Sequence, residues 1–294
     1  MTPGSDRIQS IELRSCGRTL PRSENRLGRL NDVSPEDSAD VLRARLEEEG
    51  YLLLRGFFAR EKVAAARRAI LGSLSDDGAL DPAYPMEDGV VRKGFRSDFR
   101  SEKDEFPEVR EIVEAPALNS FFDQHFQEAS VPLKHIWLRM KSPGRATAPH
   151  CDIVYMNRGS QRMLTIWIPL GDVPLELGPL MVLENSHRSQ ILRRRYCKQD
   201  VAQKKSFFDW HFRHGGFFRG GQYTKNPVAA QQELGGRWLT SDFFAGDVII
   251  FSTFLLHGSL DNQTDRIRLS ADARYQPAAD PMDPRWGDAT PSTY

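Results

Sequence analysis

The stretch that decides the fold of this 294-residue chain is AGDVIIFSTFLLHGSLDNQTDRIRLSADARYQP, residues 245–277. It reads as a Gly-Asp turn, an apolar strand, a histidine, a polar turn and a second strand. Because side chains alternate between the two faces of a strand, the polar residues of the second strand are expected to share one face. They are Arg268, Ser270, Asp272 and Arg274. The apolar residues between them are expected to face the other way.

The rest of the C-terminal half repeats this pattern of short strands. From about residue 132, apolar runs are separated by Gly, Pro, Asn and Asp, as in LKHIWLRMKSPG and RMLTIWIPLGDV. Such a succession is typical of an all-β fold. We therefore predict a mainly β protein whose core is a jelly-roll, that is, a cupin-like double-stranded β-helix.

The N-terminal half carries the signals of helices. Residues 34–50 predict a helix with Ser34 as its N-cap, Pro35 at the first helical position and Gly50 as its stop. We expect these helices to flank the β-core. The further elements predicted before the β-core are a strand at 51–58 and helical segments at 59–74 and around 106–126.

Composition and charge restrict the class of protein. Residues 1–35 are polar and lack periodicity, so we expect an N-terminal arm followed by a single domain over residues 36–294. A formal net charge of zero argues against a general nucleic-acid binder, and no apolar run approaches the length of a membrane span. The three scattered cysteines and the lack of an apolar signal-peptide core favour a cytoplasmic protein.

Three side chains have the pattern of a metal site: His150 and Asp152 in APHCDIVY, and His257 in the stretch quoted first. On an extended strand residues i and i+2 point to the same side, so His150 and Asp152 can bind one metal ion while Cys151 points away. His257 must then come from a strand folded back beside the first. Two imidazoles and one carboxylate form the ligand set of non-haem Fe(II) oxygenases, which leaves positions of the ion open for reactants.

Four further stretches extend the pattern beyond these ligands. EGYLLLRGFFAREKVAAARRAI looks like a strand-helix opening, KSPGRATAPHCDIVY carries the H-x-D motif, GPLMVLENSHR ends in Ser-His-Arg, and LLHGSLDNQTDRIRLS carries the distal histidine and an arginine eleven residues later. Together they make the chain resemble the phytanoyl-CoA dioxygenase-like family of Fe(II)/2-oxoglutarate-dependent oxygenases over roughly residues 48–278. Glu184 and Asn185 stand where that family has Pro-Gly.

The resemblance implies a set of cofactors and a reaction. The triad of His150, Asp152 and His257 would bind Fe(II), and 2-oxoglutarate and O₂ would be consumed with release of succinate and CO₂. Related halogenases have Gly or Ala in place of the aspartate, so Asp152 favours hydroxylation of an unactivated C–H bond of a small organic metabolite. Desaturation, ring closure and epimerisation remain open. The residues expected to hold 2-oxoglutarate are Arg268, Ser270, Ser259 and Trp167.

Polar side chains on two strands are candidates for the substrate pocket. Trp137 and Arg139 share a face of the strand before the H-x-D motif, and Asp272 and Arg274 share the polar face of the last strand. We propose all four as substrate-binding residues. An internal ion pair between Asp272 and Arg274, or between Asp272 and Arg139, is an equally good interpretation of the three charges.

A long insertion at residues 187–237 is placed to form a lid. It contains eleven Lys or Arg residues against three acidic ones, interleaved with aromatic residues. An insertion of this length between core strands is usually functional or disordered, and the aromatic residues argue against disorder. Its charge favours an anionic substrate such as a phosphate, a carboxylate or an acyl thioester. A solvated basic flap or an oligomer contact would explain the same charge.

Two other functions fit the same residues. A cupin-like metal-dependent isomerase, or a dioxygenase that does not use 2-oxoglutarate, would keep the triad and have no need of Arg268. A non-catalytic scaffold would be expected to have a broken triad, whereas this triad is intact. The expected partner is a small molecule in each enzymatic case, and the sequence leaves the oligomeric state open.

Overall fold

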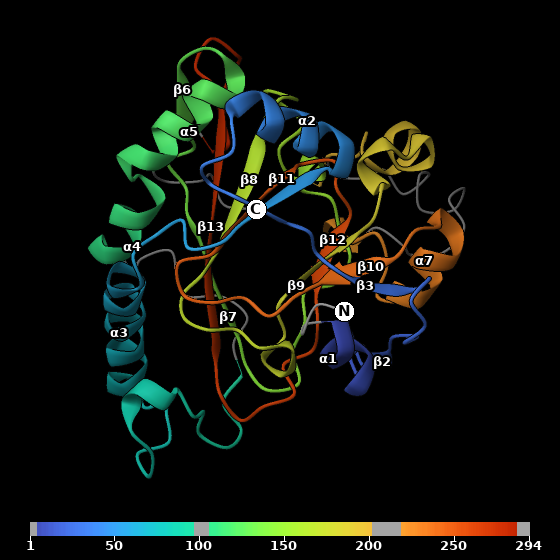
Figure 1. Cartoon of the computed structure of the whole chain (residues 1–294). Coiled ribbons are helices and arrows are strands. Elements are labelled where there is room, and N and C mark those ends of the chain that lie inside the picture. Colours follow the sequence, from blue (N-terminus) through green and yellow to red (C-terminus); the bar gives the residue numbers. More distant parts are fainter. Residues whose placement is uncertain (1–4, 97–105, 202–218, 287–294) are drawn as a thin grey trace.

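The computed structural model describes residues 5–96, 106–201 and 219–286 (Figure 1). It is a mixed α/β protein with two main, largely antiparallel sheets. The large sheet has the strand order β4-β5-β11-β8-β13-β6, and β7 also pairs with β13. The small sheet has the order β12-β9-β10-β3, and β1 and β2 form a separate pair.

The strands of the large sheet are β4 (Asp32–Val33), β5 (Tyr51–Leu54), β6 (Ser130–Pro132), β7 (Trp137–Lys141), β8 (Leu164–Pro169), β11 (Val248–Ser252) and β13 (Arg268–Pro277). The other strands are β1 (Arg14–Ser15), β2 (Arg18–Thr19), β3 (Leu27–Arg29), β9 (Leu180–Leu183), β10 (Trp238–Thr240) and β12 (His257–Ser259). The helices are α1 (Ser5–Ser10), α2 (Ala39–Glu49), α3 (Arg60–Asp76), α4 (Pro107–Val113), α5 (Pro116–Phe126) and α7 (Pro227–Leu234). Short helical turns are η1 (Met86–Asp88), η2 (Asp152–Val154), η3 (Leu175–Leu177), η4 (Ser186–Arg188), η5 (Leu192–Tyr196) and η6 (Arg219–Gly221).

Helix α2 ends where the sequence predicts and begins later. Gly50 adopts a left-handed conformation (φ 81°) and its N–H closes the last turn on Leu46 O. The N-cap is Ser38, whose side chain accepts from Val41 N, so the prediction of Ser34 is wrong. Ser34 instead accepts from Glu36 N through its hydroxyl. Such local side-chain bonds favour a turn over a helix start.

One predicted helical segment and one apolar stretch, each continuous in the sequence, are divided into two elements in the structure. The helical segment around 106–126 forms α4 and α5, because Pro116 disfavours the helical conformation in the residue before it, and Ala115 is extended (ψ 137°). The apolar run that leads to His257 forms β11 in the large sheet and β12 in the small sheet. His257 therefore lies on the strand that faces the large sheet from the other side of the core.

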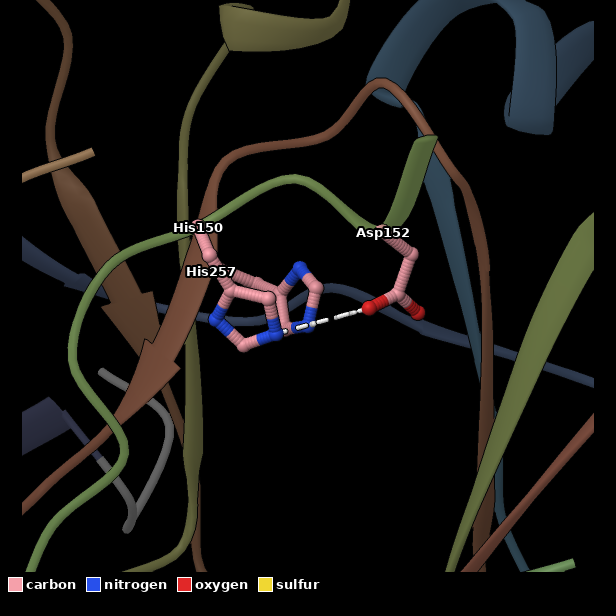
Figure 2. A group of neighbouring side chains, drawn as sticks. All are labelled: His150, Asp152 and His257. Atoms are coloured by element: carbon pink, nitrogen blue, oxygen red, sulfur yellow. Dashed lines mark ion pairs between the residues drawn. The ribbon is translucent and has the colours of Figure 1, made fainter. Parts of the chain in front are cut away.

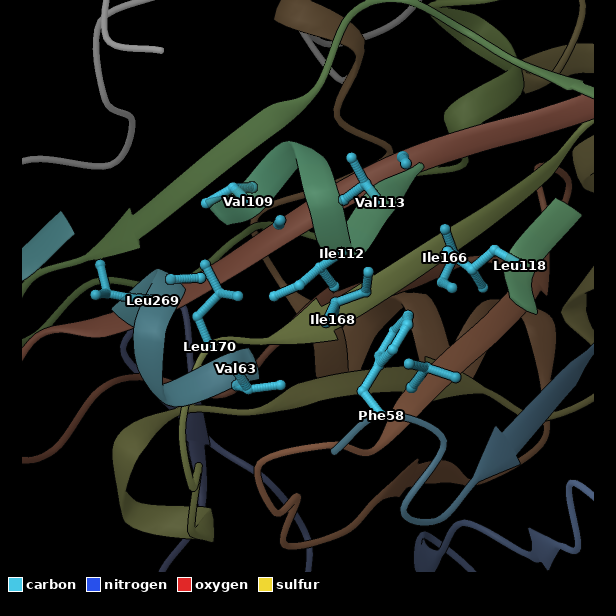
Figure 3. Close-up of a cluster of buried hydrophobic side chains, with 14 of the residues drawn as sticks. Phe58, Val63, Val109, Ile112, Val113, Leu118, Ile166, Ile168, Leu170 and Leu269 are labelled. Atoms are coloured by element: carbon cyan, nitrogen blue, oxygen red, sulfur yellow. The ribbon is translucent and has the colours of Figure 1, made fainter. Parts of the chain in front are cut away.

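The core has two layers that follow the alternation of side chains in the large sheet. Ile166 and Ile168 of β8 pack against α3, α4 and α5 (Figure 3), which line one side of β13 in Figure 1. Trp167, between them in sequence, belongs to the cluster that joins the large sheet to β9 and β10. The expectation for β13 is confirmed, because Leu269, Ala271 and Ala273 all lie in the helix-side cluster. The polar residues of β13 consequently lie on the face turned to the small sheet.

Residues 5–33, in the segment expected to be an arm, supply edges to both sheets. Strand β3 pairs in parallel with β10, and β4 pairs in parallel with β5. Ile8, Leu13 and Leu20 are buried in the cluster that also holds Cys151. Among the described residues, no helix has both the length and the apolar character that a membrane crossing requires.

Candidate metal centre

The two histidines are brought together by backbone pairing. His150 N donates to His257 O (2.8 Å) and His257 N donates to His150 O (2.9 Å), an isolated antiparallel bridge. Each ring has its Nδ1 at a backbone carbonyl two residues earlier, Ala148 O (2.9 Å) and Leu255 O (3.0 Å). A carbonyl partner makes Nδ1 the protonated nitrogen, so Nε2 presents its lone pair for a metal.

Asp152 reaches the same point from the start of the turn η2. The expectation that both H-x-D ligands lie on one strand is wrong, since regular extended structure ends at Cys151 (φ −112°, ψ 136°). The extended Cys151 still puts its neighbours on one side. Asp152 Oδ1 lies 3.4 Å from His150 Nε2 and 3.8 Å from His257 Nε2 (Figure 2). Cys151 Sγ points away to Phe254 O (3.3 Å) within a hydrophobic cluster, as expected.

The protonation states suit a divalent cation. Burial opposes ionisation of Asp152, but Arg274, His257 and His150 outweigh it and hold the pKa of the carboxyl well below its usual range. Burial, with the neighbouring His150, lowers the pKa of His257 to about 3, so its imidazole is neutral. One ligand atom from each of the three buried residues lies within 4.8 Å of the others. An ionised carboxylate, the neutral imidazole of His257 and the ring of His150 at this spacing fit Fe(II).

The second carboxylate oxygen of Asp152 is held by two side chains. Thr165 Oγ1 donates to Oδ2 (2.7 Å) and Arg274 Nη2 donates to the same oxygen (2.9 Å). Sequence reasoning missed Thr165. The available signal is its place two residues before Trp167 in an otherwise apolar strand, which puts both side chains on the inner face of β8.

Arg274 is part of a chain of charges that runs away from the metal centre. Its Cζ lies 3.8 Å from the centroid of the Trp137 ring, and its Nη2 lies 3.7 Å from Asp272 Oδ2. Asp272 in turn pairs with Arg139 Nε. Both ion pairs that the sequence offered as alternatives to substrate binding are therefore formed. Arg274 is buried, whereas the side chain of Arg139 keeps 13% of its surface exposed.

The residues expected to hold 2-oxoglutarate divide into two groups. Arg268 is buried on the inner face of β13, donates through Nη1 to Ser270 Oγ (2.9 Å), and has its Cζ 5.7 Å from the centroid of the Trp167 ring. These three side chains form one group. Ser259 Oγ accepts from Thr147 N (2.8 Å) and donates to Leu260 O (3.1 Å), so its hydroxyl stabilises the segment before His150.

The described ends of the 187–237 insertion contact the ligand segment. Tyr155 stacks edge-on to the His150 ring (centroids 5.8 Å apart) and donates to Gly220 O (2.7 Å). Tyr196 donates to Gly221 O (2.5 Å) and accepts from Cys151 N (3.1 Å). Sequence reasoning missed both tyrosines. Residues 202–218 of the insertion, with aromatic residues Phe207, Phe208, Trp210, Phe212, Phe217 and Phe218, lie outside the described residues.

Known proteins resemble this chain in sequence and in fold. A family model described as phytanoyl-CoA dioxygenase (PhyH) matches residues 46–270. The 1-deoxypentalenic acid 11-beta-hydroxylase of Streptomyces exfoliatus is 24% identical over 253 residues, which cover 83% of each chain. The protein of the same name from Streptomyces arenae is 23% identical with the same coverage.

Two solved structures show the likeness in three dimensions. EctD from S. alaskensis, with 2-oxoglutarate and 5-hydroxyectoine, superposes with a TM-score of 0.59 at 20% identity, covering 91% of this chain and 88% of EctD. The carbocyclase SnoK from nogalamycin biosynthesis has a TM-score of 0.59 at 19% identity, covering 89% of this chain and 99% of SnoK. At these identities the likeness shows a shared fold.

The fold and the buried triad define a non-haem iron oxygenase. The chain belongs to the phytanoyl-CoA dioxygenase family, and as in that family its cofactors are iron and 2-oxoglutarate. His150, Asp152 and His257 are placed so that they could hold the metal ion.

Proposed function

We propose that this enzyme hydroxylates an unactivated C–H bond of a small organic molecule that carries an anionic group. The observation that carries the proposal is the buried triad, in which an ionised carboxylate faces two imidazoles. The curated relatives support the reaction and the substrate class, since they are named as hydroxylases of 1-deoxypentalenic acid, a carboxylic acid. We further infer that the two main sheets form the double-stranded β-helix of the family.

Bound iron would let O₂ act as the oxidant, and 2-oxoglutarate would supply two of the electrons by its own oxidation to succinate and CO₂. The chain supplies positions and charges around them. Arg268 is proposed to pair with the far carboxylate of 2-oxoglutarate, because a buried guanidinium suits bidentate capture of a carboxylate. Ser270 orients this guanidinium, and the indole of Trp167 covers it, so that water has little access to the ion pair.

Trp137 and Arg139 are proposed to line the substrate side of the centre. Both are only partly buried, and Arg139 connects through Asp272 and Arg274 to the metal ligand. Arg193, Arg194 and Arg195 are exposed on η5, beside the ligand segment that Tyr196 contacts. This positive surface supports an anionic substrate and the lid role of the insertion. A cytoplasmic location stays part of the proposal and is consistent with three free thiols.

Titration of the Fe(II)-loaded protein with 2-oxoglutarate without oxygen tests the proposal. We expect the weak visible charge-transfer band of the chelate to appear and to saturate. Arg268→Ala should raise the 2-oxoglutarate concentration needed by about 10²–10⁴-fold, because breaking a buried charge pair costs about 3–5 kcal/mol. Arg266→Ala is the matched control, since Arg266 is an exposed arginine two residues away.

The outcomes separate the candidate functions. A wild-type affinity in Arg268→Ala would assign the carboxylate to another cation, and a loss of affinity in Arg266→Ala in the same experiment would identify Arg266 as that cation. Iron binding without any band would instead favour the cupin-like enzyme that does not use 2-oxoglutarate. If the protein binds neither iron nor 2-oxoglutarate, the result would favour the non-catalytic scaffold.

A further inference from the structure

Thr165 and Arg274 form a cross-strand pair that holds one oxygen of the metal ligand. Strands β8 and β13 run antiparallel, and Thr165 and Arg274 are direct partners in their register. Directly opposed residues point to the same face of a sheet with their Cβ atoms about 5 Å apart. Both side chains donate to Asp152 Oδ2, at 2.7 Å and 2.9 Å.

The two donors have little freedom to move. Thr165 is buried within the central strand of the large sheet. Arg274 is buried between the Trp137 ring (3.8 Å) and Asp272 (3.7 Å). A donor whose own position is fixed by packing orients the group that it contacts, which is the usual task of side chains behind a metal ligand.

The other oxygen of Asp152 lies on the opposite side, toward the metal position. Oδ1 is 3.4 Å from His150 Nε2 and 3.8 Å from His257 Nε2. A carboxylate can ligate through one oxygen or through both, and the second mode takes one more coordination position. In a facial triad those further positions are the ones that reactants use.

We infer that Thr165 and Arg274 are positioning residues that restrict Asp152 to ligation through Oδ1 alone. By binding Oδ2, they prevent the carboxyl from rotating to present both oxygens, and they keep the coordination positions for reactants open. Both residues act through Asp152. The inference depends on the metal triad and not on the proposed role of Arg268 or on the substrate.

Thr165→Val is the variant that tests this inference with least disturbance. Valine matches threonine in shape and removes only the donor, and Thr165→Ser restores a hydroxyl. Thr240→Val is the matched control, because Thr240 is equally buried and its hydroxyl donates to Leu180 O (2.8 Å) in the small sheet, without a contact to the triad. Arg274→Met removes the second donor to Asp152. If this variant does not fold, Thr165→Val still tests the inference by itself.

The probe is Mn(II) in the absence of 2-oxoglutarate. By electron paramagnetic resonance we expect Thr165→Val to weaken Mn(II) binding by about 10–100-fold, the usual effect of removing a group behind a ligand. Thr165→Ser and Thr240→Val should bind as the wild type does. Equal affinities for Thr165→Val and wild type, or equal losses in Thr165→Val and Thr240→Val, would overturn the inference.

Counting the metal-bound water molecules separates positioning from general loss of structure. A triad that ligates through three atoms leaves roughly three positions for water on an octahedral ion. Oxygen-17 broadening of the Mn(II) signal should give this number in the wild type and about one fewer in Thr165→Val. An unchanged number would contradict the restriction to one oxygen. Failure of the proposed 2-oxoglutarate chemistry would leave both measurements unaffected.

Discussion

Two buried clusters of aspartate and arginine in this protein differ in one respect. At the metal centre Asp152 meets Arg274, and near the end of the described chain Asp200 and Asp283 meet Arg285. All five side chains are buried. The clusters resemble one another in composition, so the difference between them lies in how each carboxylate oxygen is used.

In the second cluster every carboxylate oxygen accepts from a donor that carries a proton. Asp283 accepts from Arg285 Nε (2.9 Å) and Nη2 (2.5 Å) on its two oxygens. Asp200 accepts from Arg285 Nη1 (2.8 Å) and Arg158 Nε (2.6 Å). Each carboxylate oxygen of this cluster therefore has a donor. The cluster joins the segment around Asp283 and Arg285 to the residues around Asn157 and Asp200.

At the metal centre only one oxygen of Asp152 is used in this way. Oδ2 has Thr165 and Arg274 as donors, whereas Oδ1 faces two imidazole nitrogens whose protons are on the opposite side of each ring. An anionic oxygen directed at two lone pairs is stabilised by a cation placed between them. A carboxylate whose two oxygens both accept from donors can join segments, whereas the Asp152 carboxylate, with one oxygen facing two imidazoles, is placed to hold a metal ion.

The largest effect is expected from removing the Asp152 carboxylate. Asp152→Ala should abolish iron-dependent turnover and Mn(II) binding, because the site loses its only anionic ligand, while the far-ultraviolet circular dichroism stays that of the wild type. Turnover of 2-oxoglutarate and electron paramagnetic resonance measure the two losses. Full activity in this variant would refute the ligand assignment.

Breaking the cluster of Asp200, Asp283 and Arg285 should affect stability instead. Arg285→Met leaves two buried carboxylates without their shared partner and should lower the free energy of unfolding by about 3–5 kcal/mol. Urea denaturation measures the loss. Mn(II) affinity should be unchanged at temperatures where the variant is folded, and a loss of metal binding as large as in Asp152→Ala would erase the distinction between the two clusters.

The cluster of Asp200, Asp283 and Arg285 should also make the free energy of unfolding depend on pH. Burial opposes ionisation of Asp283, but Arg285 and two backbone N–H groups outweigh it and lower the pKa of the carboxyl. Stabilisation by an ionised carboxylate with a lowered pKa is complete above the ordinary value of about 3.9 and is lost as the pH falls through the folded-state value. Asp283→Asn should therefore be less stable than wild type at pH 7, and the difference should shrink below about pH 4. A constant difference between pH 7 and pH 2.5 would contradict this assignment.

The smallest effect is expected at the surface pair of Glu184 and Arg237. Their closest atoms are 2.6 Å apart, but the side chains are 27% and 42% exposed, so water screens the attraction. Glu184→Gln should cost at most about 1 kcal/mol in urea denaturation. A loss comparable to that of Arg285→Met would show that exposure is a poor guide to the worth of an ion pair in this fold.

Some elements could be predicted because their signals are local. The alternation in β13 put Arg268, Ser270, Asp272 and Arg274 on one face, since that depends only on the period of a strand. Gly50 ended α2 for an equally local reason. Ser34 and Ser38 are both good caps, and the choice between them depended on hydrogen bonds within the turn at Ser34 that periodicity does not contain.

The site shows the same division. The sequence by itself predicted which residues form the candidate metal site, because two imidazoles and one carboxylate are the ligand set typical of non-haem Fe(II) enzymes. The structure brings these three side chains together. Only the tertiary structure decided that Arg274 supports Asp152 and that Thr165 assists it. Their meeting depends on the register between β8 and β13, two strands that are distant in the chain. Register is set by packing of the whole sheet, so no local pattern in the sequence contains it.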